Sequence, residues 1–113
     1  MTAASQTKYK HQARIIKALA HPTRLFIVDE LSRGERCVCE LKDMIGVEMP
    51  TVSRHLAVLK SAGILETDKR GLQVFYRLRV PCVLNFFKCV EAVQNNDRKP
   101  ASRIASSKSG CAT

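Results

Sequence analysis

The stretch MPTVSRHLAVLKSAGILETDKRGLQVFYRLRV, residues 49–80, changes its hydrophobic period part-way along. In the first half Val52, Leu56 and Leu59 recur at helical spacing, and a proline stands where a first helical turn would begin. In the second half apolar residues alternate with polar ones on either side of a turn expected at residues 68–71. The stretch therefore predicts a helix followed directly by a two-stranded hairpin.

Helical periodicity also accounts for most of the remaining chain. It predicts helices near residues 8–19, 22–33, 40–45 and 82–94. Beyond residue 95 large apolar side chains are few and Ser, Lys and Arg are frequent, which is typical of a disordered segment. We therefore predict one mainly α-helical domain with a small β-hairpin, residues 1–95, and a basic, disordered tail, residues 96–113.

Charge is segregated along the chain, which has a net charge of +9. Residues 1–24 contain five basic and no acidic side chains, residues 29–48 are net acidic, and residues 49–80 are net basic. Such segregation favours a polyanionic partner, with nucleic acid the leading candidate. A basic surface without a specific partner is the alternative that charge alone leaves open.

The sequence also indicates a compartment and excludes some classes of function. No apolar run approaches the length of a membrane span, and the N-terminal segment lacks the apolar core of a secretory signal, so we expect a cytoplasmic protein without a membrane partner. In the cytoplasm the five cysteines are expected to be reduced thiols. No nucleophile–base pair, phosphate loop or paired set of acids is present, which argues against an enzyme.

A short helix, a tight connection over residues 46–49 and a second helix together predict a helix-turn-helix, and the hairpin that follows would be its wing. In such modules the second helix lies in the major groove of double-stranded DNA and reads base edges near its N-terminus. The residues expected in that position are Thr51, Ser53, Arg54 and His55. Lys69 and Arg70, expected at the tip of the wing, would contact phosphate or the minor groove.

Three segments of the sequence resemble one protein family. LAHPTRLFIVDEL, ERCVCELKDMIGVEMPTVSRHLAVLKSAGIL and RGLQVFYRL are similar to the ArsR/SmtB family of dimeric winged-helix repressors, from about residue 12 to residue 94. The segment CVCEL resembles the arsenic-responsive and lead- or cadmium-responsive members. The resemblance implies a homodimer built on the first and last helices, which needs no cofactor to bind operator DNA and is released by a metal.

The apolar residues of the two terminal helices agree with a dimer of this kind. Ile15 and Ile16 on the first helix, and Phe86 and Phe87 on the last, form stripes that a small winged helix cannot fully bury by itself. A twofold dimer through these helices would match a palindromic DNA site.

Cys37 and Cys39 are the candidate ligands for As(III) or Sb(III). Residues two apart on a helix point about 200° apart, whereas in an extended segment they share a face. We therefore expect Cys37 on a short strand and Cys39 as the cap of a helix that starts at Glu40, where the helix N-terminus favours the thiolate that a soft metal needs. The alternative is that both cysteines are small buried hydrophobic residues.

The chain departs from the arsenic-sensor pattern at Lys42, where such members often have a third cysteine. A third sulfur would have to come from Cys89, Cys82 or Cys111. The zinc-sensing pattern of the family, with Asp and His ligands on the last helix, is absent because none of the three histidines lies there.

Three further functions remain open at this point. One is a repressor of the same fold that responds to Cd(II) or Pb(II). Another is a thiol redox or persulfide sensor, in which Cys37 or Cys39 would form a disulfide with a distant cysteine such as Cys89. The third is a DNA-binding protein of nucleoid type that senses nothing.

Overall fold

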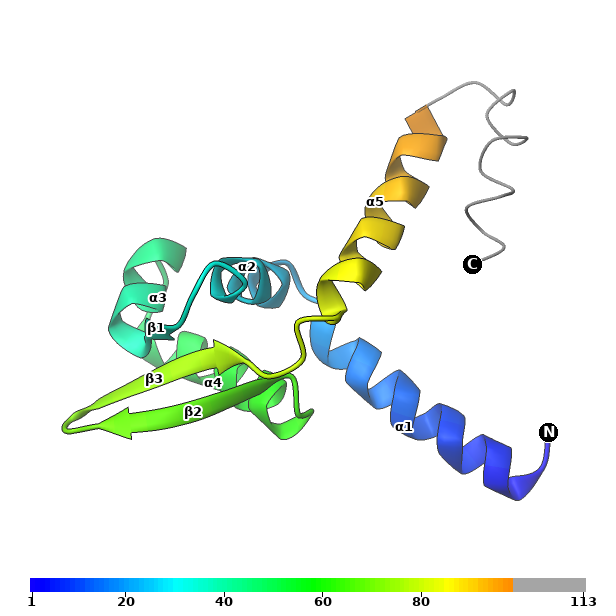
Figure 1. Cartoon of the computed structure of the whole chain (residues 1–113), viewed down its shortest axis with the longest axis horizontal. Helices are drawn as coiled ribbons and strands as arrows, with labels where there is room; N and C mark the ends of the chain where they lie inside the picture. The colour runs from blue at the N-terminus through cyan, green and yellow to red at the C-terminus, as the bar shows by residue number, and fades with distance from the viewer. Residues whose placement is uncertain (99–113) are drawn as a thin grey trace. The chain divides into compact units, whose positions relative to one another are not determined.

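The structure is a computed structural model, and it describes residues 1–98 (Figure 1). Its elements in chain order are α1 Ala3–Leu19, α2 Pro22–Leu31, β1 Arg36–Cys37, α3 Val38–Ile45, α4 Met49–Ser61, β2 Leu65–Arg70, β3 Gln73–Leu78 and α5 Val83–Arg98. Residues 1–81 form one compact unit and a second unit begins at Cys82, so the two are described separately.

The predicted helix-turn-helix is present as α3 and α4. Gly46 ends α3 with a φ of 79°, a left-handed conformation that glycine adopts without a steric penalty, and its N–H bonds back to the carbonyl of Lys42. Pro50 lies in the first turn of α4, where its missing N–H costs nothing. The two helices pack against each other, so the turn between them fixes the position of α4.

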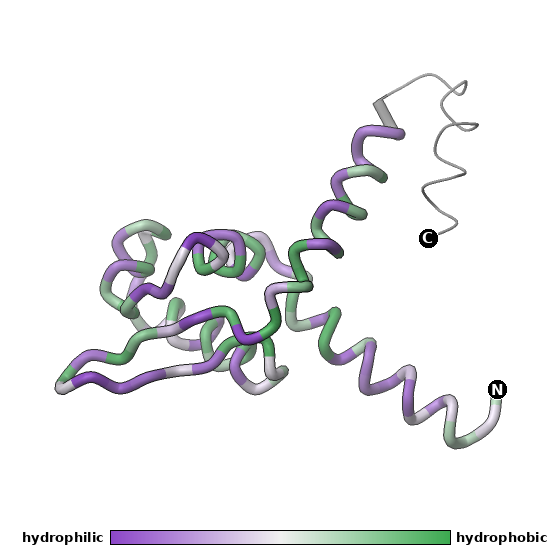
Figure 2. The backbone as a smooth tube through the Cα atoms, in the orientation of Figure 1, coloured by the Kyte–Doolittle hydropathy of each residue, from purple (hydrophilic) through white to green (hydrophobic). Residues whose placement is uncertain are grey.

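The hairpin predicted after α4 belongs to a three-stranded antiparallel sheet of order β1-β3-β2. Its turn lies at residues 71–72, not at 68–71 as the sequence suggested, because β2 extends through Arg70, which pairs with Gln73. Lys69 and Arg70 are therefore strand residues beside the tip, and the predicted position at the tip is wrong by one or two residues. Figure 2 shows that β2 is largely hydrophilic, whereas hydrophilic and hydrophobic residues alternate along β3.

A continuous apolar core joins the helices of the first unit to the sheet. Val52, Leu56 and Leu59, the predicted stripe of α4, are all fully buried. The other core residues are Ala18, Leu19, Ile27, Val28, Leu31, Cys37, Leu41, Ile64 and Leu65. α2, α3 and β2 all contact α4. Burial of the stripe therefore fixes the orientation of α4 and leaves its opposite face exposed.

The two terminal helices are longer than the sequence indicated. α1 begins at Ala3, five residues before the predicted start, because Thr2 and Ser5 form a capping box. α5 runs through Arg98, beyond the boundary predicted at residue 95. The remainder of the predicted tail, including Cys111, lies outside the described residues.

Candidate DNA interface and thiol pair

The exposed face of α4 carries the residues predicted to read DNA. Ser53 and Arg54 are exposed, and Thr51 is half-buried in the first turn. Arg54 lies opposite the buried stripe of Val52 and Leu56, and Thr51 and Ser53 flank that stripe on either side. Their placement agrees with a helix that presents its N-terminal half to a groove.

His55 differs from the other three, because it contacts a neighbouring helix. Its ring lies 4.3 Å from that of His21, centroid to centroid. His21 caps α2, and its Nδ1 accepts the backbone N–H of Thr23 at 3.1 Å. Burial, followed by the nearby His21, Arg24 and Arg54, lowers the pKa of His55 from its ordinary value. In this structure His55 joins α4 to the start of α2.

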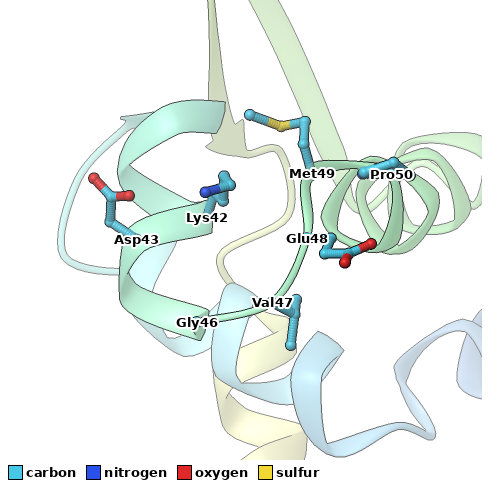
Figure 3. A pocket seen from close by; sticks show the side chains of 7 residues that line it. All are labelled: Lys42, Asp43, Gly46, Val47, Glu48, Met49 and Pro50. Atoms are coloured by element: carbon cyan, nitrogen blue, oxygen red, sulfur yellow. The ribbon is translucent and has the colours of Figure 1, made fainter.

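Figure 3 shows the connection between α3 and α4, which borders an open hollow of about 660 Å³. Lys42, the residue at which the sequence departs from the arsenic-sensor pattern, lines this hollow together with Glu48 and Met49. A lysine ammonium has no lone pair and cannot replace a thiolate as a metal ligand.

Lys69 and Arg70 differ in their surroundings, although both are exposed on β2. The Arg70 guanidinium donates to both oxygens of Glu35, at 2.6 and 3.0 Å, and to Asp68 at 3.0 Å. It also lies 4.5 Å from the centroid of the Phe75 ring. The hydrogen bonds to Glu35 and Asp68 raise the pKa of Arg70. Lys69 makes no such ion pair within residues 1–98, so it is the freer of the two cations.

The thiol pair lies where the sheet meets the helix-turn-helix. Cys37 ends β1, where it pairs with Phe75 of β3, and it is also the N-cap of α3, which begins at Val38. Cys37 is therefore on a short strand as predicted, but the prediction that Cys39 caps a helix starting at Glu40 is wrong. Cys39 lies in the first turn of α3, because the extended backbone of Cys37 (ψ 161°) permits the helix to start at Val38, two residues before the predicted start.

The two thiols are unequally accessible. Cys37 is 6% exposed and Cys39 is exposed. The carboxylate of Glu40 accepts the backbone N–H of Cys37 at 3.0 Å, and its bonds to the backbone and side chain of Cys37 lower the pKa of Glu40. The helix start is thus held by a reciprocal contact between Cys37 and Glu40.

The remaining cysteines of the described residues are in the second unit. Cys82 and Cys89 are both exposed, and the carbonyl of Cys82 accepts the N–H of Asn85 at the start of α5. Within residues 1–98 no three His, Cys, Asp or Glu side chains gather closely enough to hold a metal ion. A third thiol ligand therefore stays a prediction.

Comparisons with known proteins agree with this architecture. A model described as "Bacterial regulatory protein, arsR family" matches residues 21–67, the segment from the start of α2 into β2. The homodimeric winged helix-turn-helix DNA-binding domain of Mb0332 from Mycobacterium bovis, a possible ArsR-family regulator, is 33% identical, with a TM-score of 0.73. The alignment covers 84% of this chain and 88% of that one.

The chain belongs to the ArsR family. Two curated relatives are the biofilm growth-associated repressor of Xylella fastidiosa, 47% identical over 66 residues, and the arsenic resistance transcriptional regulator ArsR1 of Pseudomonas putida, 45% identical over 65. The matched segments cover 58% and 57% of this chain, and 58% and 51% of those proteins. The chain thus spans little more than half the length of these relatives.

Membership of the ArsR family confirms the predicted winged helix-turn-helix and the predicted family. The relatives are transcriptional regulators, which agrees with the argument against an enzyme. Among residues 1–98, no helix combines the length and the hydrophobicity that crossing a membrane requires.

Proposed function

We propose that this ArsR-family chain is a transcriptional repressor that binds operator DNA as a homodimer and is released by As(III) or Sb(III). α4 would enter the major groove with Thr51, Ser53 and Arg54, and the β2–β3 wing would contact the backbone through Lys69. The relatives named as repressors, and the homodimeric DNA-binding domain of Mb0332, support the first part of this proposal.

Apolar residues left exposed on the terminal helices support the homodimer. Ile15 and Ile16 on α1 are 43% and 50% exposed, and on α5 Phe86, Val90 and Val93 are 42% to 61% exposed. Phe87 is half-buried. Such stripes are unfavourable in water, and a second copy of the chain would cover them.

The position of Cys37 is the observation that supports release by a metalloid ion. Cys37 is the last residue of β1 and also the N-cap of α3. Two thiols within three residues are the soft donors that As(III) prefers. To share one ion with Cys39, the Cys37 sulfur must leave its buried position, and the contact between Cys37 and Glu40 must change.

Movement at the start of α3 would reach the DNA-binding surface through packing. Leu41, one turn along α3, is fully buried, and α3 packs directly on α4. Cys37 also pairs with Phe75 in the wing. An ion that binds the DNA-free arrangement more tightly than the DNA-bound one would therefore shift Ser53 and Arg54 out of register with the groove.

The test is a release titration with the reduced protein on a fluorescent duplex selected from a random library by the protein itself. Arsenite should release the parent protein, whereas Cys37→Ser and Cys39→Ser should each bind DNA normally and fail to respond. Cys82→Ser and Cys89→Ser test two of the candidate third ligands, and loss of response in either would identify it as that ligand. Release of Cys37→Ser at the same arsenite concentration as the parent would refute the site.

DNA reading is tested separately with Arg54→Ala. Arg54 is exposed and makes no ion pair within residues 1–98, so its loss should leave the fold intact and remove the preference for the selected duplex. We expect a loss of about 1–3 kcal/mol in discrimination, which is typical of one base contact. Unchanged preference would contradict the placement of Arg54 in the groove.

The unequal exposure of the two thiols favours a second candidate, a redox or persulfide sensor. An exposed Cys39 is open to oxidants, and it could form a disulfide with a distant thiol such as Cys89. In that case polysulfide should release DNA and arsenite should not, and only one of the two cysteines should be essential. Cd(II) and Pb(II) belong in the same titration, because they too prefer thiolates.

A further inference from the structure

Four cations of the first unit surround a cavity that lies apart from the thiol pair. Arg14 and Lys17 of α1, Arg24 of α2 and Arg54 of α4 line a cavity of about 410 Å³. Its other lining residues are small or apolar: Ala18, Ala57, Val58, Ser61 and Ala62. No acidic side chain is among them, so the lining of the cavity is positively charged and its uncharged residues have short side chains.

The four cations are not used in ion pairs within the fold. Every salt bridge among residues 1–98 engages Arg33, Arg36, Arg70 or Arg77. Arg14 donates instead to the hydroxyl of Ser61 at 3.3 Å, and Arg24 to the carbonyl of Ala18 at 3.1 Å. The arginines of this unit thus fall into a neutralised set and a set whose charge remains available.

Two further observations indicate that the cavity suits an anion. The Nε of Arg24 is buried and has no hydrogen-bond partner in the described structure, which is unfavourable unless a bound group compensates. The charges of Arg24 and Arg54 also contribute to the lowered pKa of His55, beside the cavity. Uncompensated positive charges held close together attract anions.

We infer that this cavity binds a phosphate of the DNA backbone next to the groove entered by α4. The inference rests on the proposed function, because Arg54 belongs both to the cavity and to the surface predicted to read DNA.

The cavity would therefore supply a clamp without sequence preference. Arg14 and Lys17 reach it from α1, so the clamp joins α1 to the DNA-binding surface of α4. Arg14, Lys17 and Arg24 would add affinity for every duplex alike, and base contacts by Ser53 and Arg54 would supply the discrimination.

The test compares two double variants of α1 with the same change in charge. Arg14→Gln with Lys17→Gln removes two cations from the cavity, and Lys8→Gln with Lys10→Gln removes two from the same helix outside it. Affinity for the selected duplex and for an unrelated duplex is measured by fluorescence anisotropy over a series of KCl concentrations. Circular dichroism verifies that each variant is folded.

We expect the cavity variant to lower the slope of log affinity against log salt by about 0.9, the value for one phosphate contact. Both duplexes should lose affinity by the same factor, and the control should change the slope by less than half as much. Equal slopes in the two variants would overturn the inference while leaving DNA binding itself intact. A parent protein that binds no duplex would overturn the proposed function as well.

A last arm distinguishes the DNA backbone from a free anion. Inorganic phosphate or pyrophosphate is titrated into the DNA-free protein and followed by NMR shifts of α1 and α4. Weak, non-saturating shifts agree with a clamp that needs the duplex. Saturable binding at one site, lost in the cavity variant while its salt slope stays that of the parent, would assign the cavity to a small anion and overturn the inference.

Discussion

Replacing Cys37 separates its structural role from its proposed sensing role, because two substitutions affect the helix cap differently. Cys37 caps α3 in a capping-box arrangement with Glu40, yet sulfur is a weak hydrogen-bond acceptor. Serine is among the best N-cap residues. Its hydroxyl would accept the backbone N–H of Glu40, and the carboxylate of Glu40 would still accept the backbone N–H of residue 37. Alanine provides no acceptor.

The structure gives the expected difference between the two variants. Losing an N-cap acceptor costs about 1 kcal/mol, with a range of about 0.5–2. Serine keeps a side chain of nearly the same size at a site that is 6% exposed, so it creates no large cavity. We therefore expect Cys37→Ser to be more stable than Cys37→Ala by about 1 kcal/mol, or about 4–8 °C in Tm for a domain of this size.

Thermal unfolding by circular dichroism in reducing buffer measures this difference, with Cys39→Ser and Cys39→Ala as controls. Cys39 is exposed in the first turn of α3 and caps nothing, so its serine variant should gain no such advantage. A Cys37→Ser protein no more stable than Cys37→Ala would refute the capping role.

Three other properties can be checked. Lys69→Gln should lower the salt slope of DNA binding by about 0.9, whereas Arg70→Gln should lower it by less, because Glu35 and Asp68 already hold its charge; equal slopes would contradict this. The lowered pKa of His55 means that its neutral form is favoured in the fold, so its contribution to stability is present above about pH 6.5 and is lost as the pH falls through its folded pKa. Tm should therefore fall below pH 6.5, and less so in His55→Gln; parallel pH profiles would argue otherwise. Sedimentation should find a dimer at micromolar concentration and a shift toward monomer in Phe86→Ser, since Phe86 is 42% exposed on α5; a monomeric parent would exclude the dimer.

The local sequence pattern was enough to predict those helices and strands whose signal lies within a single element. The stripe of Val52, Leu56 and Leu59, the glycine after Ile45 and the alternation in the hairpin each have a signal within one element. Met44 lies at helical spacing from the buried Leu41 and is nevertheless 43% exposed. Helical spacing does not reveal how deeply a short helix is buried.

Contacts between distant segments could not be predicted. Glu35 and Arg70 are 35 residues apart, so their ion pair follows from the fold rather than from any motif. The same is true of the ring contact between His21 and His55, through which His55 packs against the start of α2. β1 is only two residues long, too short for alternation to be visible. The cavity bordered by Arg14 and Arg54 likewise exists only once α1 lies beside α4.

The cap position of Cys37 has a consequence for how such regulators diverge. Serine would serve α3 equally well there, and the exposed Cys39 can become almost any good helix former without disturbing the core. Two codon changes could therefore erase the thiol pair, or create it in a relative that lacks it, while the DNA-binding scaffold folds as before. Responsiveness to a new chemical signal would then be gained and lost far faster in evolution than the fold that transmits it.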